Sequence, residues 1–177
     1  MRRSGGALAL SAVLLTSCGL SAATATPRCG SPERLAVVAQ AVPSAAYVPC
    51  LRALAPGWRA TAFDAADGSS RFVLLSDRSG DRPVDVVLTA ACDVDGASPE
   101  RARAEGVQSW VRLRSVSPLY AGRRYDVFSG GCVQVDFAFP RGPHIPLMEE
   151  LGAAVGLVRR SELAVDLRDR LGVELDP

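Results

Sequence analysis

Six strand-like stretches follow one another between Trp58 and Phe139, and no helical pattern interrupts them. In the clearest stretch, Val133, Val135 and Phe137 alternate with polar or small residues, which is the period of a strand with one buried face. The six stretches are 58–63, 71–76, 83–92, 107–116, 124–128 and 132–139. Strands at such short spacing favour an antiparallel sheet, so the sequence predicts a sheet of five or six strands, with 93–106 as a surface loop.

Helical patterns lie before and after this region. One helix is predicted to begin at Ser31, with Pro32 in its first turn, and to end at Pro43. Two helices are predicted after Pro146, the second capped by Ser161 and ended by Gly172. Their apolar stripes are Leu147, Leu151, Ala154, Val155 and Val158 in the first, and Leu163, Leu167 and Leu171 in the second. Because each helix has one apolar face, we expect an α+β fold in which all three cover one face of the sheet.

The start of the chain has the composition of an export signal. Arg2 and Arg3 precede an uncharged, mostly apolar run from Ala7 to Leu15. This run is shorter than the roughly 20 residues that a membrane-spanning helix needs. Positive charge, a short apolar run and small residues together are typical of a secretory signal.

The end of that run is more specific. Leu15-Thr16-Ser17-Cys18 resembles the lipobox of bacterial lipoproteins. The resemblance implies cleavage before Cys18, a diacylglycerol on its thiol, and anchoring at the extracytoplasmic face of the cell membrane. Residues 1–17 are then a signal peptide, 18–28 a short polar tether, and 29–177 a single domain. The alternative is ordinary cleavage after Ala23-Thr24-Ala25, which would leave a soluble protein without an anchor.

Four cysteines remain when Cys18 is assigned to the lipid, and they allow three pairings. Cys29 and Cys50 flank the first predicted helix, so a bridge between them would clip that helix to the chain that follows. Cys92 ends one predicted strand and Cys132 begins another, so the two lie side by side if these strands are antiparallel neighbours. Local geometry therefore favours disulfides Cys29–Cys50 and Cys92–Cys132.

A wider resemblance extends over most of the mature chain. Its residues are Val48-Pro49-Cys50, Pro56-Gly57-Trp58, Ala91-Cys92-Asp93-Val94, Gly96-Ala97, Tyr125, Phe128 and Gly130-Gly131-Cys132. Together they resemble a group of uncharacterised exported or membrane-bound proteins from high-GC Gram-positive bacteria. The resemblance implies a compartment and a role for the cysteines, and it implies no activity.

Charge argues against nucleic acid as a partner. All 20 basic residues are arginine, which a GC-rich genome explains economically. Without Arg2 and Arg3, the mature chain has 18 arginines against 19 acidic residues, a formal charge of −1. That balance lacks the basic footprint of a nucleic-acid-binding protein.

Few residues have the pattern of a catalytic or metal site. His144 is the one histidine, so a Ser-His-Asp or Cys-His site would have to use it, and Gly-x-Ser-x-Gly is absent. Asp93-Val94-Asp95-Gly96 has a faint likeness to a calcium loop, but Ala97 and Ala104 stand where the EF-hand pattern needs oxygen ligands. Glu149-Glu150 is interpreted as a solvated helix face. We therefore expect no catalytic residue, metal or cofactor.

Arginines and aromatic side chains offer the remaining binding candidates. Arg123-Arg124, Arg159-Arg160 and the pair Arg112/Arg114 could bind anionic headgroups or envelope polymers, or could simply be solvated surface. Trp110, Tyr120, Tyr125 and Phe128 could line a pocket or belong to the core. We expect a non-enzymatic lipoprotein with two partners, the membrane through Cys18 and an envelope protein or polymer. The alternatives are an envelope-directed hydrolase that uses His144 and a sensor domain for a small ligand or lipid.

Overall fold

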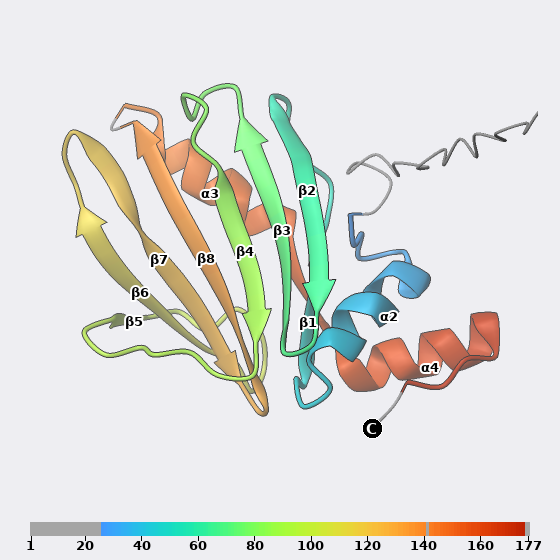
Figure 1. The fold of residues 1–177 in the computed structure, drawn as a ribbon. Coiled ribbons are helices and arrows are strands. Elements are labelled where there is room, and N and C mark those ends of the chain that lie inside the picture. Colours follow the sequence, from blue (N-terminus) through green and yellow to red (C-terminus); the bar gives the residue numbers. More distant parts are fainter. Residues whose placement is uncertain (1–25, 141, 176–177) are drawn as a thin grey trace, which may run out of the picture.

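A seven-stranded antiparallel sheet dominates the computed structural model, which describes residues 26–140 and 142–175 (Figure 1). Its strands lie in the order β2 (Trp58–Ala66), β3 (Ser69–Ser76), β4 (Val84–Thr89), β8 (Gly131–Pro140), β7 (Leu119–Phe128), β6 (Gln108–Ser115) and β5 (Ser98–Glu100). Every neighbouring pair is antiparallel. The α+β class and the antiparallel sheet are confirmed.

The predicted number of strands is wrong. Five or six were expected, but Ser98–Glu100 adds a short seventh strand at the edge, within the stretch predicted to be a loop. Three residues are too few to show an alternating pattern, and β5 exists because it pairs with β6.

A second, two-stranded sheet was also missed. It joins β1 (Tyr47–Leu51) to β9 (Val155–Arg159), with Val48 opposite Val158 and Leu51 opposite Val155. The sequence predicts helix for 155–158, but pairing with β1 converts it to strand, as suits β-branched residues. Gly156 stands opposite Cys50, where an added Cβ would lie 2.9 Å from the Cys29 sulfur. The close approach of the disulfide explains why this strand position is a glycine.

Three helices complete the described fold: α2 (Pro32–Ala41), α3 (His144–Ala154) and α4 (Arg160–Leu171). Helix α3 lies behind the large sheet, and α2 and α4 lie side by side beyond the β2 edge (Figure 1). The expectation that all three helices cover the sheet needs correction, because α4 packs mainly on α2 and β9. Ser161 is not the cap of α4, because the helix begins at Arg160 and Arg159 occupies the cap position. Gly172 does end it, in a left-handed conformation with φ of 65°.

The core lies between the large sheet and the elements behind it. Alternate residues of β8 point into it, as the sequence predicts, and Val133, Val135 and Phe137 are buried. They pack in one apolar cluster with Leu147 and Leu151 of α3. The other helices and strands add Leu35, Val38, Leu163, Leu167, Phe72, Leu74, Val86 and Leu88 to this cluster.

The export signal, Cys18 and most of the tether precede Thr26 and so lie outside the described residues. Within 26–140 and 142–175, no helix combines the length and the apolar character needed to cross a bilayer.

Candidate functional site

The side of the seven-stranded sheet that faces away from α3 is the broadest candidate surface, and we call it the open face (Figure 1). Residues directly opposite one another in antiparallel strands share a face of the sheet. The pairing sets Arg112 opposite Arg123, Arg123 opposite Asp136, and Asp136 opposite Asp85. Side chains alternate between the two faces along each strand, so these four point to the face that is turned away from the buried Val135 and Phe137. The result is a line of charged residues across β6, β7, β8 and β4.

Ion pairs tie this line together. Arg123 donates from Nε to Asp136 at 2.9 Å, and Arg114 approaches the same carboxylate at 3.6 Å. Gln134 also donates to Asp136, at 2.7 Å. At the other end, Arg71 of β3 donates from Nε to Asp85 at 2.6 Å. We refer to Arg71, Asp85, Asp136, Arg123, Arg112 and Arg114 as the charged row.

The arginines of the charged row offset the repulsion between its two aspartates. Asp85 and Asp136 stand opposite each other on neighbouring strands, where two carboxylates repel. Arginines on both sides offset that repulsion, and the hydrogen bond that Arg123 donates to Asp136 raises the pKa of Arg123 above its ordinary value. Asp64 stands opposite Arg71, and Asp93 lies 3.8 Å from Arg112, so these two arginines have further acidic neighbours. Arg114 and Arg123 share the single carboxylate of Asp136, which leaves an excess of positive charge at that part of the row.

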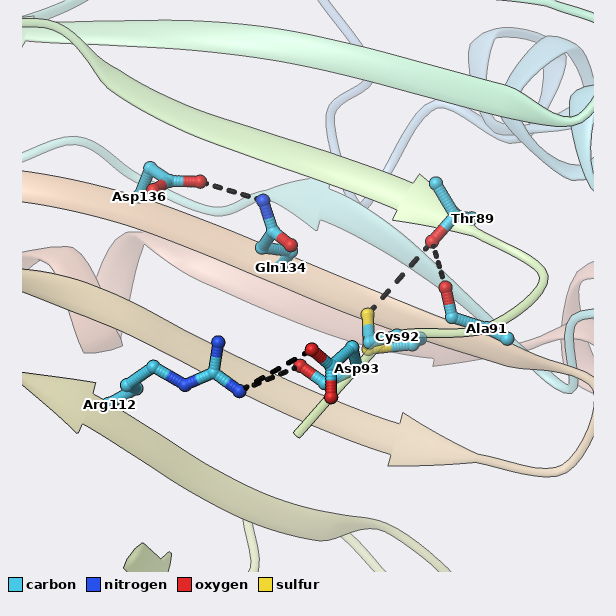
Figure 2. Close-up of a disulfide and its surroundings, with 8 residues drawn as sticks. Thr89, Ala91, Cys92, Asp93, Arg112, Gln134 and Asp136 are labelled. Carbon is cyan, nitrogen blue, oxygen red and sulfur yellow. Dashed lines mark hydrogen bonds and ion pairs between the residues drawn. A yellow bond between two sulfur atoms is a disulfide. The ribbon is translucent and has the colours of Figure 1, made fainter. Parts of the chain in front are cut away.

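A disulfide borders the charged row. Cys132 pairs with Thr89 and with Val127 in the sheet, and it is bonded to Cys92. Figure 2 shows Arg112 reaching from β6 toward Asp93, next to this disulfide. The bridge and Arg112 together fix the segment after β4 against the open face. Cys92–Cys132 and Cys29–Cys50 are both present, and these are the two pairs expected from local geometry.

The Asp93-Val94-Asp95-Gly96 segment forms a turn. The backbone N–H of Asp95 donates to the Asp93 carboxylate at 2.9 Å, and Arg112 donates to the carbonyl oxygens of both residues. In the part of the chain that the structure describes, no three His, Cys, Asp or Glu side chains gather as metal ligands would.

The four aromatic side chains do not form the pocket that was weighed as an alternative, because the sheet separates them. Trp110 and Tyr125 stand opposite each other and share the side of the charged row, where Arg112 lies 5.7 Å from the centre of the Tyr125 ring. Tyr120 and Phe128 point to the other side, Tyr120 against Phe137 and Phe128 against Tyr47. All four belong to packed surroundings on one side of the sheet or the other.

His144 lies away from the open face. It is the first residue of α3, it is partly exposed, and its ring centre is 4.7 Å from that of Tyr120. The ring contact places it at the core-side end of β7 and not among the charged row.

The two adjacent glutamates of α3 have different surroundings. Glu149 is exposed, whereas Glu150 accepts a hydrogen bond from Trp58 Nε1 at 2.6 Å and a second from Arg78 Nη1 at 3.1 Å. The bond from Arg78 lowers the pKa of Glu150 below its ordinary value. Glu150 therefore joins α3 to β2 and to the turn after β3, and its interpretation as solvated surface is wrong.

The tandem arginines are also divided. Consecutive strand residues point to opposite faces, so Arg123 lies in the charged row while Arg124 points to the α3 side and binds Glu100. Arg159 pairs with Glu105 and lies over the Tyr47 ring, and Arg160 donates to the Ala39 carbonyl at 2.7 Å. Only Arg112, Arg114 and Arg123 of the predicted arginines share the open face.

Sequence reasoning did not single out Arg71, Asp85 or Asp136. The signal that could have found Asp136 is a charged residue between Val135 and Phe137 in the most regular strand. Its neighbours could not be named, because they depend on the pairing register of β4, β7 and β8.

Comparison with known proteins adds a distant likeness. No protein-family model matches the chain, and no curated protein matches it. The chain is similar to a crystal structure from Bacteroides thetaiotaomicron VPI-5482, with 12% sequence identity and a TM-score of 0.34. The alignment covers 74% of this chain and 60% of that one, so the chain spans less than two thirds of that protein's length. A likeness this distant assigns neither a fold nor a function.

Proposed function

We propose that this protein is an exported lipoprotein, anchored through Cys18 on the extracytoplasmic face of the membrane, that binds an envelope protein or polymer through its open face. The proposed role is binding and not catalysis, and His144 takes no part in it. The observation that carries the proposal is the charged row, a pattern of four arginines and two aspartates on a sheet face that no helix of residues 26–140 and 142–175 covers.

The disulfides support export. Stable disulfides persist in oxidising compartments outside the cytosol and are rare inside it. This domain has two, and the bridge at Cys132 adjoins the proposed binding surface. The lipobox adds the anchor, because a diacylglycerol supplies the two acyl chains that hold a protein stably on a membrane.

The tether limits how far the domain stands from the bilayer. Seven residues lie between Cys18 and Thr26, the first described residue, and even in a fully extended chain the eight steps from one to the other span only about 28 Å. The domain would therefore meet partners that are themselves close to the membrane surface.

The shape and charge of the open face suggest the kind of partner. Neighbouring strands lie about 4.8 Å apart, so β3, β4, β8, β7 and β6 together span about 19 Å. A broad surface of this kind suits a protein or a polymer. Arg114 and Arg123 share one carboxylate, and this local excess of arginine favours a partner that carries carboxylates or phosphates.

Charge reversal on the open face tests the binding role. Arg114 is 55% exposed and approaches Asp136 at 3.6 Å, so Arg114→Glu changes the surface charge with little loss of internal contact. We expect the variant to retain at most about a tenth of the partner captured by the wild type after cross-linking in intact cells, since like charges across an interface are strongly unfavourable.

Arg170→Glu on α4 is the matched control, because Arg170 is 60% exposed and approaches Asp166 at 3.9 Å. It should capture the same partner as the wild type. If Arg114→Glu and Arg170→Glu capture that partner equally well, the open face is not the binding surface.

A further inference from the structure

We propose that a hollow on the α3 side of the sheet binds a phosphate group. The hollow has a volume of about 200 Å³ and is lined by Glu100, Arg101, Arg103 and Arg124. Glu100 and Arg124 point away from the open face, and an added Cβ on Gly152 would lie 3.9 Å from Arg124 Nη1, which places the hollow beside the end of α3. The proposal concerns a second site and does not rest on the function of the open face.

Arg103 forms the rigid wall of the hollow. Its Nη1 donates to Asp126 at 2.9 Å, and its Nη2 donates to the carbonyl of Gly152 at 2.9 Å and to that of Val155. Asp126 is fully buried and also accepts a hydrogen bond from Ser109 Oγ at 2.7 Å. Asp126 therefore neutralises Arg103 and holds it in place. Because Glu100 offsets Arg124 in the same way, the net positive charge of the hollow comes from Arg101.

Arg124 presents donors in a defined direction. Its Nε donates to Glu100 at 2.8 Å, and its side chain is only 18% exposed. That bond fixes the plane of the guanidinium group and leaves Nη1 and Nη2 without a hydrogen bond to the residues described. A planar guanidinium held in this way is suited to paired bonds with phosphate oxygens.

Arg101 supplies the unpaired cation of the hollow. It is exposed, and it makes no hydrogen bond or ion pair with any residue of 26–140 or 142–175. Three arginines and one glutamate line the hollow, and with Asp126 behind them the net formal charge is +1. One unneutralised guanidinium group beside the donors of Arg124 favours an anion with several oxygen acceptors over a neutral ligand.

Size limits the ligand. Pockets for drug-sized molecules occupy about 300–1,000 Å³. A hollow of about 200 Å³ accommodates one phosphate group with a small substituent. Such a group occurs in free phosphate and its small esters, and also in a lipid headgroup.

Titration calorimetry on the full-length protein in neutral detergent tests the site, with inorganic phosphate as the probe and chloride used to keep the ionic strength constant. We expect saturable binding of one phosphate per chain. Arg101→Gln and Arg124→Gln should each weaken it by about tenfold or more, because each removes charge-assisted hydrogen bonds. Arg170→Gln, on the exposed side of α4 and outside both proposed binding surfaces, should leave the affinity unchanged.

Arg101→Gln keeps the test valid if Arg124→Gln fails to fold, since Arg101 has no contact to lose. The same titration is repeated with glycerol 3-phosphate and with mixed micelles that contain phosphatidylglycerol. The source of the phosphate is the probe that binds more tightly to the wild type and loses affinity in Arg101→Gln. Absence of saturable phosphate binding would overturn the site. Equal weakening by Arg101→Gln and Arg170→Gln would overturn it as well, since it would mean that only general surface charge is involved.

Discussion

Replacing Cys92 and Cys132 together by alanine is expected to lower the free energy of unfolding by about 4 kcal/mol, because the bridge closes a loop over a separation of 40 residues. Most of that effect comes from the unfolded chain, which gains freedom when the crosslink is removed. The folded sheet keeps its hydrogen bonds, since β4 and β8 pair along their length without the disulfide. Guanidinium unfolding of the exported protein at neutral pH measures the change.

The second disulfide provides the comparison. Cys29–Cys50 spans a separation of 21 residues, so replacing both of its cysteines by alanine should cost about 3 kcal/mol, somewhat less than the first pair. A loss below about 1 kcal/mol for Cys92→Ala with Cys132→Ala would contradict the expected role of the bridge. Detection of a free thiol at Cys29, Cys50, Cys92 or Cys132 in the unfolded wild type would contradict the pairing itself.

Arg103→Met is expected to destabilise the fold by about 3–5 kcal/mol, because it leaves the Asp126 charge buried without its cation. Asp126 is 0% exposed, and after the change it retains only the hydrogen bond from Ser109 among the side-chain contacts described above. The substitution also frees the carbonyl oxygens of Gly152 and Val155, which Arg103 joins to the sheet. Chemical denaturation at neutral pH gives the change in unfolding free energy.

Two further variants distinguish the loss of this ion pair from the general effect of removing an arginine. Arg101→Met, two positions away on an exposed residue, should change stability by no more than about 0.5 kcal/mol. Arg103→Met combined with Asp126→Leu should recover part of the loss, because removing both members of a buried pair leaves no uncompensated charge. If Arg103→Met costs as little as Arg101→Met, the pair does not stabilise this part of the fold.

The sequence allowed the centre of the fold to be predicted where local pattern and tertiary packing agree. In 132–139 the alternation of apolar and polar residues matches the burial in β8. The two disulfides also agree with expectation, because Cys92 and Cys132 are close once the strands around them are antiparallel. Gly172 ends α4 because few other residues adopt a left-handed conformation without strain.

Elements that depend on distant partners could not be predicted in this way. Val155 and Val158 fit a helical stripe as well as a strand, and only the pairing with β1 decides between the two. The short strand β5 and the position of α4 on α2 and β9 likewise follow from tertiary packing. These are cases in which long-range contacts override local propensity.

The candidate site has the same limitation. Arg114 and Arg123 were visible in the sequence, but Asp136, the carboxylate that both of them approach, lies on another strand at a position fixed by register. Neighbours in the sequence, such as Arg123 and Arg124, turned out to belong to opposite faces of the sheet and to different sites. A charged row of this kind appears only when the strand order is known.

Fractionation of cells that produce the wild type and Cys18→Ser tests the central claim, that this is a disulfide-bonded binding domain held on the outer face of the membrane by one lipidated cysteine. We expect the wild type in the membrane fraction. Cys18→Ser should appear in the medium, folded and with both disulfides intact, because the domain does not depend on the anchor for its core. A Cys18→Ser protein that remains with the membrane would contradict anchoring through Cys18.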